Sequence, residues 1–519
     1  MLAKVKCFSV HGITGCDVEI EVDISNGLPR FDIVGLADTA VKESKERVKA
    51  AIKNSGFDFP LRRVTVNLAP AYLKKEGSAF DLPIAVGILA ATRQAKFNDL
   101  GGHGFVGELS LDGSVKPISG VLPMAIRAKA SGVLRIAVPA ENAFEAAVVE
   151  GLCVYPAGSI RELMDHFRGE RPISPCVVDA HSALAAEADK PHDFSDVRGQ
   201  AKAKRALEIA ASGGHNCLMV GPPGSGKTML ARRLPTILPS LTYDEAIEIT
   251  TIHSVAGALP PGVALVSQRP FRNPLSNASA ASLAGGGRDP KPGEISLAHN
   301  GVLFLDELPE FGGGVLDVLR QPLEDGCVTV SRASGKVSYP ARTTFICAAN
   351  PCKCGHFLDS RGGCTCSPMD IKKYFGRVSG PLLDRIDIQI EVSRPDYDAL
   401  FEQGGGPCGE SSSDIRRRVE RTRQIQKDRY KGTGYYSNAH LEGATLDEHC
   451  SLDAPSRSLL RRAYDRMALS PRAHNRILKV ARTIADMDCA GSISERHIAE
   501  AIGYRSFDRR GWFTSGGAR

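Results

Sequence analysis

The chain has 519 residues, of which 42% are hydrophobic and 24% charged, and its formal net charge is +6. This length predicts two to four domains, and the composition is typical of a globular protein rather than a fibrous or disordered one. No apolar run approaches the length of a membrane span, and the first residues lack the apolar segment of a signal peptide. We therefore expect a cytoplasmic protein whose 14 cysteines are free thiols or metal ligands.

The positive charge is concentrated toward the C-terminus. From Ser411 to Arg519 there are 21 Lys and Arg against 13 Asp and Glu, a net of +8, so the rest of the chain carries −2. The densest part is a predicted helix from Asp414 to Tyr430. Such a segment is typical of contact with a polyanion, although a solvated arginine-rich helix face is an equally common reason for it.

Residues 1–172 are predicted to form an α/β domain, followed by a linker over 173–194 that is rich in Pro, Ala and charge. Val18–Ile24 alternates polar and apolar residues, as a half-buried strand does, and Val64–Leu68 is a second strand. Two helices are predicted in the same domain, Thr39–Asn54 and Asp81–Ala91.

One segment of this domain could carry chemistry. Lys75–Ala79 resembles the serine segment of the Lon-type Ser-Lys peptidases, and Gly113–Leu122 resembles the segment that carries their lysine. Leu122 takes the place of that lysine, so Ser78 lacks the amine that would deprotonate its hydroxyl. Two lysines lie nearby but off the pattern, Lys116 and Lys129. The sequence thus predicts a protease-like fold without proteolysis, in which Ser78 caps the following helix.

The middle of the chain is organised around Gly221–Thr228, which reads GxxxxGK[ST], the phosphate-binding P-loop. An apolar run, Cys217–Val220, precedes it as a predicted strand, and a helix follows. Backbone N–H groups of the loop and the helix N-terminus would face a triphosphate. Lys227 is expected to reach the β- and γ-phosphates of ATP, and Thr228 to hold Mg²⁺. The predicted nucleotide contacts are Gly221, Pro222, Pro223, Gly224, Ser225, Gly226, Lys227, Thr228 and Met229.

Two further apolar strands end in polar side chains. Gly301–Leu308 contains Asp306 and Glu307 at its end, and Thr344–Asn350 ends in Asn350. Carboxyl ends of strands border the ligand crevice of an open α/β sheet. Asp306 is therefore expected to hold Mg²⁺ through water and Glu307 to polarise the attacking water. Asn350 would orient that water or touch the γ-phosphate, although asparagine at a strand end is often only a turn former.

Two arginines are candidates for contacting the charge that develops on the transferred phosphoryl group. Arg385 fits a finger donated by one subunit to the next, which would put the ATPase sites between the subunits of a ring. An internal ion pair of Arg385 with Asp384 or Asp387 is the alternative. Arg472 is expected over the γ-phosphate in the sensor-2 role, with Arg476, one turn later, as its rival.

Inserts interrupt this core. Gln268–Arg272 and Gly285–Arg288 frame a segment rich in Ser and Ala between the first two motifs. Between the second and third, a β-hairpin is predicted with Arg332 and Lys336 at its tip. If that hairpin points into the pore of a ring, the two basic side chains would meet phosphates, but a plain surface hairpin fits the sequence equally well.

Four cysteines follow Asn350 within fifteen residues: Cys352, Cys354, Cys364 and Cys366. This cluster predicts a tetrahedral thiolate site for Zn²⁺, although the CxC spacing is less usual than CxxC. The alternative is a set of reduced thiols that pair only on oxidation.

The fold class predicted for the whole chain is α/β. The P-loop core with a parallel sheet is expected over 195–395, with the cysteine insert at 352–366, and an α-helical lid over 396–519. Three or four helices are expected between residues 452 and 503, because apolar residues recur there at helical spacing.

These segments resemble the YifB/ComM family of magnesium-chelatase-like AAA+ ATPases along nearly the whole chain. The resemblance rests on Asp23–Pro29, Lys74–Ser78, Gly221–Thr228, Pro292–Ala298, Gly301–Leu308, Gly380–Asp387 and Ile477–Asp486. It implies a Lon-like N-terminal domain, an AAA+ core and a chelatase-type lid. It also implies ATP and Mg²⁺ as cofactors, a homo-oligomeric, hexameric ring, and single-stranded or branched DNA as partner. Its members include ring helicases that drive branch migration when DNA is integrated during natural transformation.

One departure from the family stands out. Members often carry a His-His pair after Arg-Pro-Phe-Arg-x-Pro, and here Leu275 and Ser276 replace it, which puts the role of that pair in doubt for this chain. Two alternative functions remain. A metal-chelatase motor would need a partner subunit with a metal-ion-binding domain, and this chain itself has no such domain. A Lon-like peptidase or protein-remodelling ATPase is the other, and Leu122 argues against the peptidase.

Overall fold

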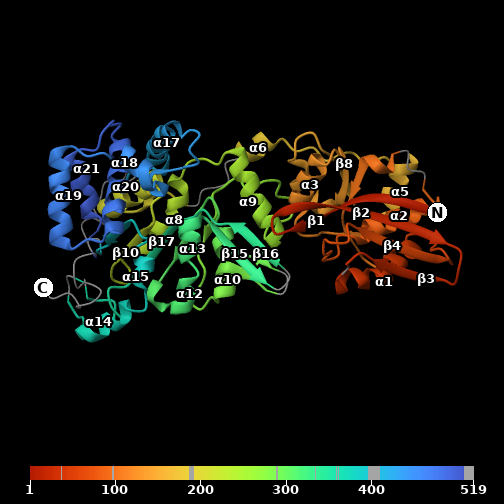
Figure 1. The fold of residues 1–519 in the computed structure, drawn as a ribbon, viewed down its shortest axis with the longest axis horizontal. Coiled ribbons are helices and arrows are strands. Elements are labelled where there is room, and N and C mark those ends of the chain that lie inside the picture. Colours follow the sequence, from red (N-terminus) through yellow and green to blue (C-terminus); the bar gives the residue numbers. More distant parts are fainter. Residues whose placement is uncertain are drawn as a thin grey trace. The chain divides into compact units, whose positions relative to one another are not determined.

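The computed structural model describes residues 1–36, 38–95, 99–185, 192–287, 290–332, 335–357, 359, 362–394, 409–505 and 507. The chain divides into two compact units (Figure 1). The first unit consists of Met1–Ala186 and Thr242–Ser267, and the second of Glu187–Leu241 and Gln268–Arg519. None of the helices in the described ranges is long and apolar enough to span a bilayer.

The first unit is built on a seven-stranded mixed sheet in the order β3-β4-β2-β1-β5-β8-β9. β2 pairs antiparallel with β1 and β4, while β5, β8 and β9 continue from β1 in parallel. The predicted alternation is present in β2, where Val18, Ile20 and Val22 are buried. The strands of this unit are β1 (Leu2–His11), β2 (Thr14–Ser25), β3 (Arg30–Val34), β4 (Arg63–Ala69), β5 (His103–Phe105), β6 (Glu108–Leu109), β7 (Val115–Lys116), β8 (Arg135–Pro139) and β9 (Cys153–Ala157).

Helices of the first unit pack on this sheet. α2 is buried on nearly every side and contacts β1 and β2, as its continuous apolar sequence requires. α1 begins where Asp38 accepts a hydrogen bond from the Val41 N–H at 2.8 Å. Both helices have the predicted bounds. The helices of this unit are α1 (Thr39–Asn54), α2 (Asp81–Ala91), α3 (Val121–Ala130), α4 (Ala143–Ala147), α5 (Ile160–Arg168), α6 (Ala180–Ala185) and α9 (Tyr243–Ala256), with 3-10 turns η1 (Leu100–Gly102) and η2 (Ala140–Asn142).

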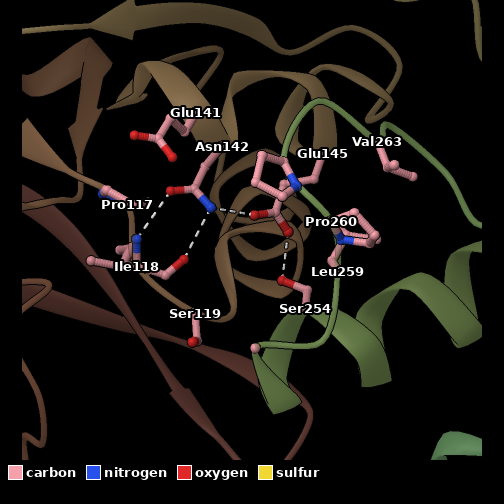
Figure 2. Close-up of a pocket in the computed structure, with 12 residues that line it drawn as sticks. Pro117, Ile118, Ser119, Glu141, Asn142, Glu145, Ser254, Leu259, Pro260 and Val263 are labelled. Atoms are coloured by element: carbon pink, nitrogen blue, oxygen red, sulfur yellow. Dashed lines mark hydrogen bonds between the residues drawn. The ribbon is translucent and has the colours of Figure 1, made fainter.

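Helix α9 belongs to the first unit, although in the sequence it lies between the P-loop and the second nucleotide motif. It contacts α3 and α6. The Ser254 carbonyl accepts a hydrogen bond from the Gly120 N–H at 3.0 Å, and the Ser254 hydroxyl donates to the buried carboxylate of Glu145 (Figure 2). Asn142 donates to the same carboxylate at 2.6 Å. Residues 242–267 are therefore folded together with the N-terminal α/β domain.

The second unit is built on a five-stranded, wholly parallel sheet in the order β11-β14-β17-β10-β18. Its central strands are buried on both faces, so their residues are continuously apolar rather than alternating. α7 contacts β10 and β18, and α8 contacts β14 and β17. The strands are β10 (Cys217–Val220), β11 (Phe271–Arg272), β14 (Val302–Leu305), β17 (Thr344–Ala349) and β18 (Ile388–Glu391). The predicted α/β class with a parallel sheet is confirmed.

Two hairpins accompany this sheet, β12 (Gly285–Gly286) with β13 (Lys291–Pro292) and β15 (Cys327–Arg332) with β16 (Gly335–Pro340). The second is the predicted hairpin; Lys336 is exposed, while the turn and the side chain of Arg332 lie outside the described residues, as does Arg288. The helices around the sheet are η3 (Phe194–Asp196), α7 (Ala201–Gly213), α8 (Lys227–Ile237), α10 (Ala280–Ala284), α11 (Glu294–Leu297), η4 (Leu308–Glu310), α12 (Gly313–Asp317), α13 (Arg320–Asp325), α14 (Pro368–Phe375) and α15 (Gly380–Leu383).

The C-terminal region is helical, as predicted, and shares one hydrophobic core with the sheet. α17 packs against α7, α8 and α20. The helices are α17 (Ser412–Arg429), η5 (Asn438–His440), α18 (Gly443–His449), α19 (Ala454–Met467), α20 (Pro471–Met487) and α21 (Glu495–Gly503).

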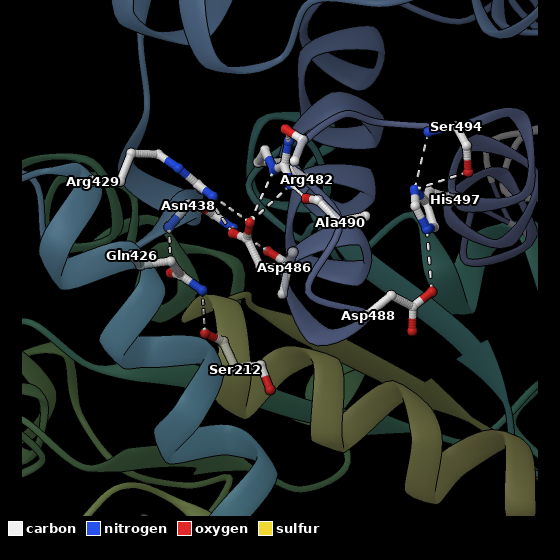
Figure 3. Close-up of polar contacts among 12 residues, drawn as sticks. Ser212, Gln426, Arg429, Asn438, Arg482, Asp486, Asp488, Ala490, Ser494 and His497 are labelled. Atoms are coloured by element: carbon white, nitrogen blue, oxygen red, sulfur yellow. Dashed lines mark hydrogen bonds and ion pairs between the residues drawn. The ribbon is translucent and has the colours of Figure 1, made fainter.

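The arginines of α17 hold the helix to the rest of the unit. Arg416 donates to the Thr236 carbonyl at 2.9 Å, and Arg423 donates to the Ala211 carbonyl at 3.0 Å. Arg429 lies 2.8 Å from the fully buried carboxylate of Asp486 (Figure 3). Much of the charge that the sequence offered to a polyanion is therefore used within the fold.

Candidate nucleotide-binding site

Lys227 is the centre of the candidate site. It is the first residue of α8 and its side chain is almost fully buried. Its amine donates to the carbonyls of Gly221 at 2.6 Å and Pro222 at 2.9 Å, and lies 3.3 Å from Oδ1 of Asn350. The strand order explains the last contact, because β17 lies directly beside β10 and both end at the same edge of the sheet.

Electrostatics make this position receptive to an anion. Burial lowers the pKa of Lys227 to about 8, against the raising effect of the Asp306 and Glu307 charges. Among the described residues no carboxylate forms an ion pair with the amine. A buried ammonium group bonded only to uncharged oxygens, among them the Ser225 hydroxyl at 3.5 Å, would gain from a phosphate at the N-terminus of α8.

The predicted Mg²⁺ ligands lie together. The hydroxyl of Thr228 donates to Oδ2 of Asp306 at 2.6 Å, so the two side chains converge from α8 and from the end of β14. A hydroxyl and a carboxylate are hard oxygen ligands of the kind that Mg²⁺ takes beside triphosphate oxygens. This donor set fits the predicted ion.

Glu307 differs from its neighbour Asp306. Its side chain is exposed and, within the described part of the chain, its carboxylate has no hydrogen-bond or ion-pair partner. Its backbone has φ +53°, in the left-handed region that non-glycine residues rarely adopt. Strain of this kind costs about 1–3 kcal/mol and is concentrated at functional sites. The geometry leaves this carboxylate available to a water molecule.

Two details of the loop depend on close packing. A Cβ at Gly221 would lie 2.1 Å from the Val392 carbonyl oxygen, so only glycine fits there. Gln200 was not singled out by the sequence analysis, yet its amide donates to the Ser225 carbonyl at 3.1 Å and to the Ser393 carbonyl at 2.6 Å. The sequence around Gln200 does not indicate that it supports the P-loop, because both of its partners are distant in sequence.

Arg385 lies at the opposite edge of the sheet from the P-loop. It precedes β18, which runs parallel to β10, and the P-loop follows the other end of β10. Its guanidinium pairs with Glu324 and donates to the Pro381 carbonyl at 2.6 Å. The pairing considered with Asp384 or Asp387 is not the one observed, and the structure does not bring Arg385 to Lys227 of the same chain.

The two lid arginines are placed differently. Arg472 is exposed and lies 3.9 Å from Asp384, again at the edge away from the P-loop of its own chain. Arg476 pairs with the buried Asp387, which also lies 3.2 Å from Nδ1 of His215. Although burial opposes it, the Arg476 charge and the His215 contact hold the pKa of Asp387 well below its usual range. The partly buried Arg476 therefore neutralises a buried carboxylate of its own chain.

The four cysteines of the insert come together, as predicted. Their sulfur atoms all lie within 4.8 Å of one another, and three of the pairs are 3.2, 3.7 and 3.8 Å apart. These distances exceed the roughly 2.05 Å of a disulfide. A tetrahedral zinc site with Zn–S bonds of about 2.3 Å has S···S edges of about 3.8 Å. The cluster formed by Cys352, Cys354, Cys364 and Cys366 therefore fits one metal ion.

The serine segment of the first unit is arranged differently from the P-loop. The Ser78 hydroxyl donates to the carboxylate of Glu108, and among the described residues no lysine is hydrogen-bonded to it. Leu122 is fully buried, and Lys75 donates to the Pro70 carbonyl instead. The prediction that Ser78 caps the following helix is wrong, because the N-cap of α2 is Phe80 and no side chain caps the helix.

A cavity of about 250 Å³ does exist in the first unit, but not at Ser78 (Figure 2). It is lined by residues around Glu145 and by the segment that follows α9, including Leu259 and Pro260. Glu145 faces it with its carboxylate already bonded to Asn142 and Ser254, and burial raises its pKa. Through these hydrogen bonds, Glu145 links the N-terminal segment of the unit to the segment that contains α9.

Sequence comparisons with known proteins give matches in both units of the chain. The family described as magnesium chelatase, subunit ChlI, matches residues 193–400, that described as subunit ChlI of Mg-chelatase matches 20–142, and that described as its C-terminal part matches 409–505. Competence protein ComM of Haemophilus influenzae is 44% identical over 511 residues, and YifB of Salmonella typhimurium is 43% identical over 509, with 98% of each chain covered. Lon protease 2 of Bacillus subtilis is 29% identical over 154 residues, 28% of either chain. The chain belongs to the YifB/ComM family of magnesium-chelatase-like AAA+ proteins.

Proposed function

We propose that the protein is an ATP-hydrolysing, ring-forming motor that acts on DNA, and that it is a helicase promoting branch migration during recombination or natural transformation. The observation that carries the proposal is the convergence of Lys227, Thr228, Asp306 and Asn350 at one edge of a parallel sheet, with the free carboxylate of Glu307 beside them. This is the set of groups that phosphoryl transfer to water requires.

Each side chain of the site has one task in this proposal. Lys227 and the backbone N–H groups of Gly221–Thr228 would bind the phosphates, and Thr228 and Asp306 would hold Mg²⁺ directly or through water. Bound ATP supplies a transferable γ-phosphoryl group whose charge the ion partly neutralises. Glu307 polarises a water molecule, and Asn350 orients it from the next strand.

The positions of Arg385 and Arg472 support the proposal of a ring. Arg385 and Arg472 are at the edge of the sheet away from the P-loop of their own chain, so neither can serve that P-loop. Offered to the P-loop of a neighbouring subunit, both would meet the γ-phosphate from outside. A head-to-tail contact gives a ring when its rotation closes, and a hexamer is the closed ring we propose.

DNA is the proposed partner, single-stranded or branched, because the relative from Haemophilus influenzae is a competence protein and the family resemblance implies branch migration. Exposed Lys336 on the β15–β16 hairpin is the basic side chain we assign to a pore-facing role. We place the protein in the cytoplasm, where thiols stay reduced; the cysteines that the structure describes form no disulfide. Zinc is the ion we assign to Cys352, Cys354, Cys364 and Cys366, because four thiolates with tetrahedral spacing favour it.

The test is ATP hydrolysis by the purified chain with no addition, with forked DNA, and with an unfolded protein, together with its mass in the presence of ATP. We expect forked DNA to raise the rate and the mass to be that of a hexamer. Lys227→Ala is the control that removes hydrolysis. Stimulation by unfolded protein alone would instead support remodelling, and a monomer indifferent to DNA would contradict the proposal.

A further inference from the structure

The cysteine insert lies directly against the P-loop. A Cβ at Gly355, inside the Cys352–Cys366 loop, would lie 2.6 Å from Cδ and 2.7 Å from Cγ of Pro223. The backbone of the insert therefore touches the ring of a P-loop residue with no space between them. Gly355 also has φ +84°, where a side chain would be strained.

The insert is also continuous with Asn350. Cys352 is fully buried and comes two residues after Asn350, whose amide oxygen faces the Lys227 amine at 3.3 Å. Farther along the insert, Asp359 lies 3.4 Å from the guanidinium of Arg394. Arg394 follows Ser393 in the chain. The Gln200 amide donates both to the Ser393 carbonyl and to the Ser225 carbonyl of the P-loop.

The other end of the insert leads to the second nucleotide motif. α14 begins two residues after Cys366, and Tyr374 near its end is buried. Arg377, just beyond the helix, donates to the Pro309 carbonyl at 3.3 Å and lies 2.9 Å from Glu310. Both partners belong to η4, which immediately follows Glu307.

The cysteine cluster holds this insert together with the Asp359–Arg394 ion pair and a few local backbone hydrogen bonds, such as that from the Gly355 N–H to the Cys352 carbonyl at 3.0 Å. Between Pro351 and Ser367 the described residues form neither helix nor strand. A short irregular segment gains order from a crosslink, and a metal on four thiolates is such a crosslink. Its loss would release the segment that touches Pro223 and carries Asn350.

We propose that the metal on these four thiolates sets the position of Pro223 and Asn350, so that its occupancy controls how tightly the P-loop binds nucleotide. The proposal rests on the proposed function only in that the P-loop binds ATP; it does not depend on DNA or on a ring. Zinc is the metal, and the site is a nucleotide-affinity switch in addition to a structural crosslink.

The experiment compares Cys364→Ser with Cys489→Ser in the full chain. Cys364 is a proposed ligand whose sulfur lies 3.8 Å from that of Cys352 and 3.7 Å from that of Cys354, and Cys489 is an exposed thiol outside the cluster. Zinc per chain is measured by mass spectrometry, and the affinity for a fluorescent ATP analogue by titration. We expect one zinc per chain in the native protein and in Cys489→Ser. We expect Cys364→Ser to lose the zinc and to bind the nucleotide about tenfold more weakly, the size of effect seen when the support of a site is removed.

A second pair of variants tests the contact without touching the ligands. Gly355→Ala pushes a methyl group into Pro223, whereas Gly362→Ala, at φ +75° in the same insert, has open space at its Cβ. We expect both to keep zinc and only Gly355→Ala to lose nucleotide affinity. This pair remains informative if Cys364→Ser fails to fold.

Three results would each overturn the proposal. They are a native chain free of zinc, a zinc-free Cys364→Ser that binds nucleotide as tightly as the native chain, and unchanged affinity in Gly355→Ala. If the chain binds nucleotide and zinc as expected but ignores DNA, only the proposed motor function fails.

Discussion

The P-loop and the Ser78 segment both resemble catalytic centres in sequence, and they are assembled to different degrees. At the P-loop, Lys227 meets Asn350 from the neighbouring strand, and Thr228 meets Asp306 from the strand beyond it. At Ser78 the hydroxyl is bonded to a carboxylate and no amine is bonded to it within the described residues. A catalytic centre needs side chains supplied by separate elements of the fold. When one of these side chains is replaced, the remaining motif segment can still serve as part of the structural framework.

The largest expected effect is that of Arg385→Ala. An arginine donated across a subunit boundary contributes about 10³–10⁵ to the rate of phosphoryl transfer. We expect the variant to assemble, to bind ATP, and to lose hydrolysis by that order, as measured by phosphate release. Mixing it with Lys227→Ala should restore some sites. Arg496→Ala, which removes an exposed arginine paired with Asp488, should hydrolyse ATP as the native chain does. Absence of rescue at every mixing ratio would argue against action in trans.

Glu307→Gln comes next. Loss of the group that polarises the attacking water should lower hydrolysis by about 10²–10⁴ while leaving ATP binding intact. Glu310→Gln is the matched control, because Glu310 is an exposed acid whose partner is Arg377. Normal turnover in Glu307→Gln, measured under saturating ATP, would remove Glu307 from its role.

A smaller effect is expected from pH. Phosphate binds the ammonium form of Lys227, whose pKa burial lowers to about 8 in the nucleotide-free chain. Affinity for ATP should therefore be complete below that value and weaken as the pH rises through it, by up to about tenfold per unit. Titrations from pH 7 to pH 9 measure this. Lys227→Arg should show a flat profile, since a guanidinium stays charged. A flat profile in the native chain would contradict the expectation.

The smallest effect is that of Ser78→Ala. Since Ser78 has no base, neither the native chain nor the variant should cleave an unfolded protein substrate, and their ATPase rates should agree. Loss of the hydrogen bond to Glu108 should lower the free energy of unfolding by about 1 kcal/mol at most. Peptide cleavage that disappears in the variant would show that the serine segment is also an assembled centre.

Local patterns in the sequence predicted most of the fold. Thr39–Asn54 was predicted with its observed bounds because Val41, Val48 and Ile52 recur at helical spacing and Gly56 follows the helix. The structure adds Asp38 as the residue that caps its start. The nucleotide motifs were visible for the same reason. Each places its polar group at the end of an apolar strand, and a parallel sheet then brings the strand ends to one edge.

What the sequence did not predict depends on contacts between distant segments. Nothing near Arg385 points to Glu324 as its partner, and nothing in the P-loop points to the contact between Pro223 and Gly355. The contact of Gln200 with the P-loop was likewise not predicted. Helix α9 belongs to the first unit because it packs against α3 of that unit. The spacing of apolar residues within α9 does not indicate which unit it will pack against.

Because residues 242–267 fold with the N-terminal domain, the backbone crosses between the two units three times, at the linker and at each end of that segment. Severing the linker with a protease would thus leave two fragments that stay together through the noncovalent packing of residues 242–267 on the N-terminal domain. A truncated protein that begins at the linker would keep α9 and α6 but lose α3, against which α9 also packs. Dissection of this molecule into separate parts has to remove both stretches of sequence or neither.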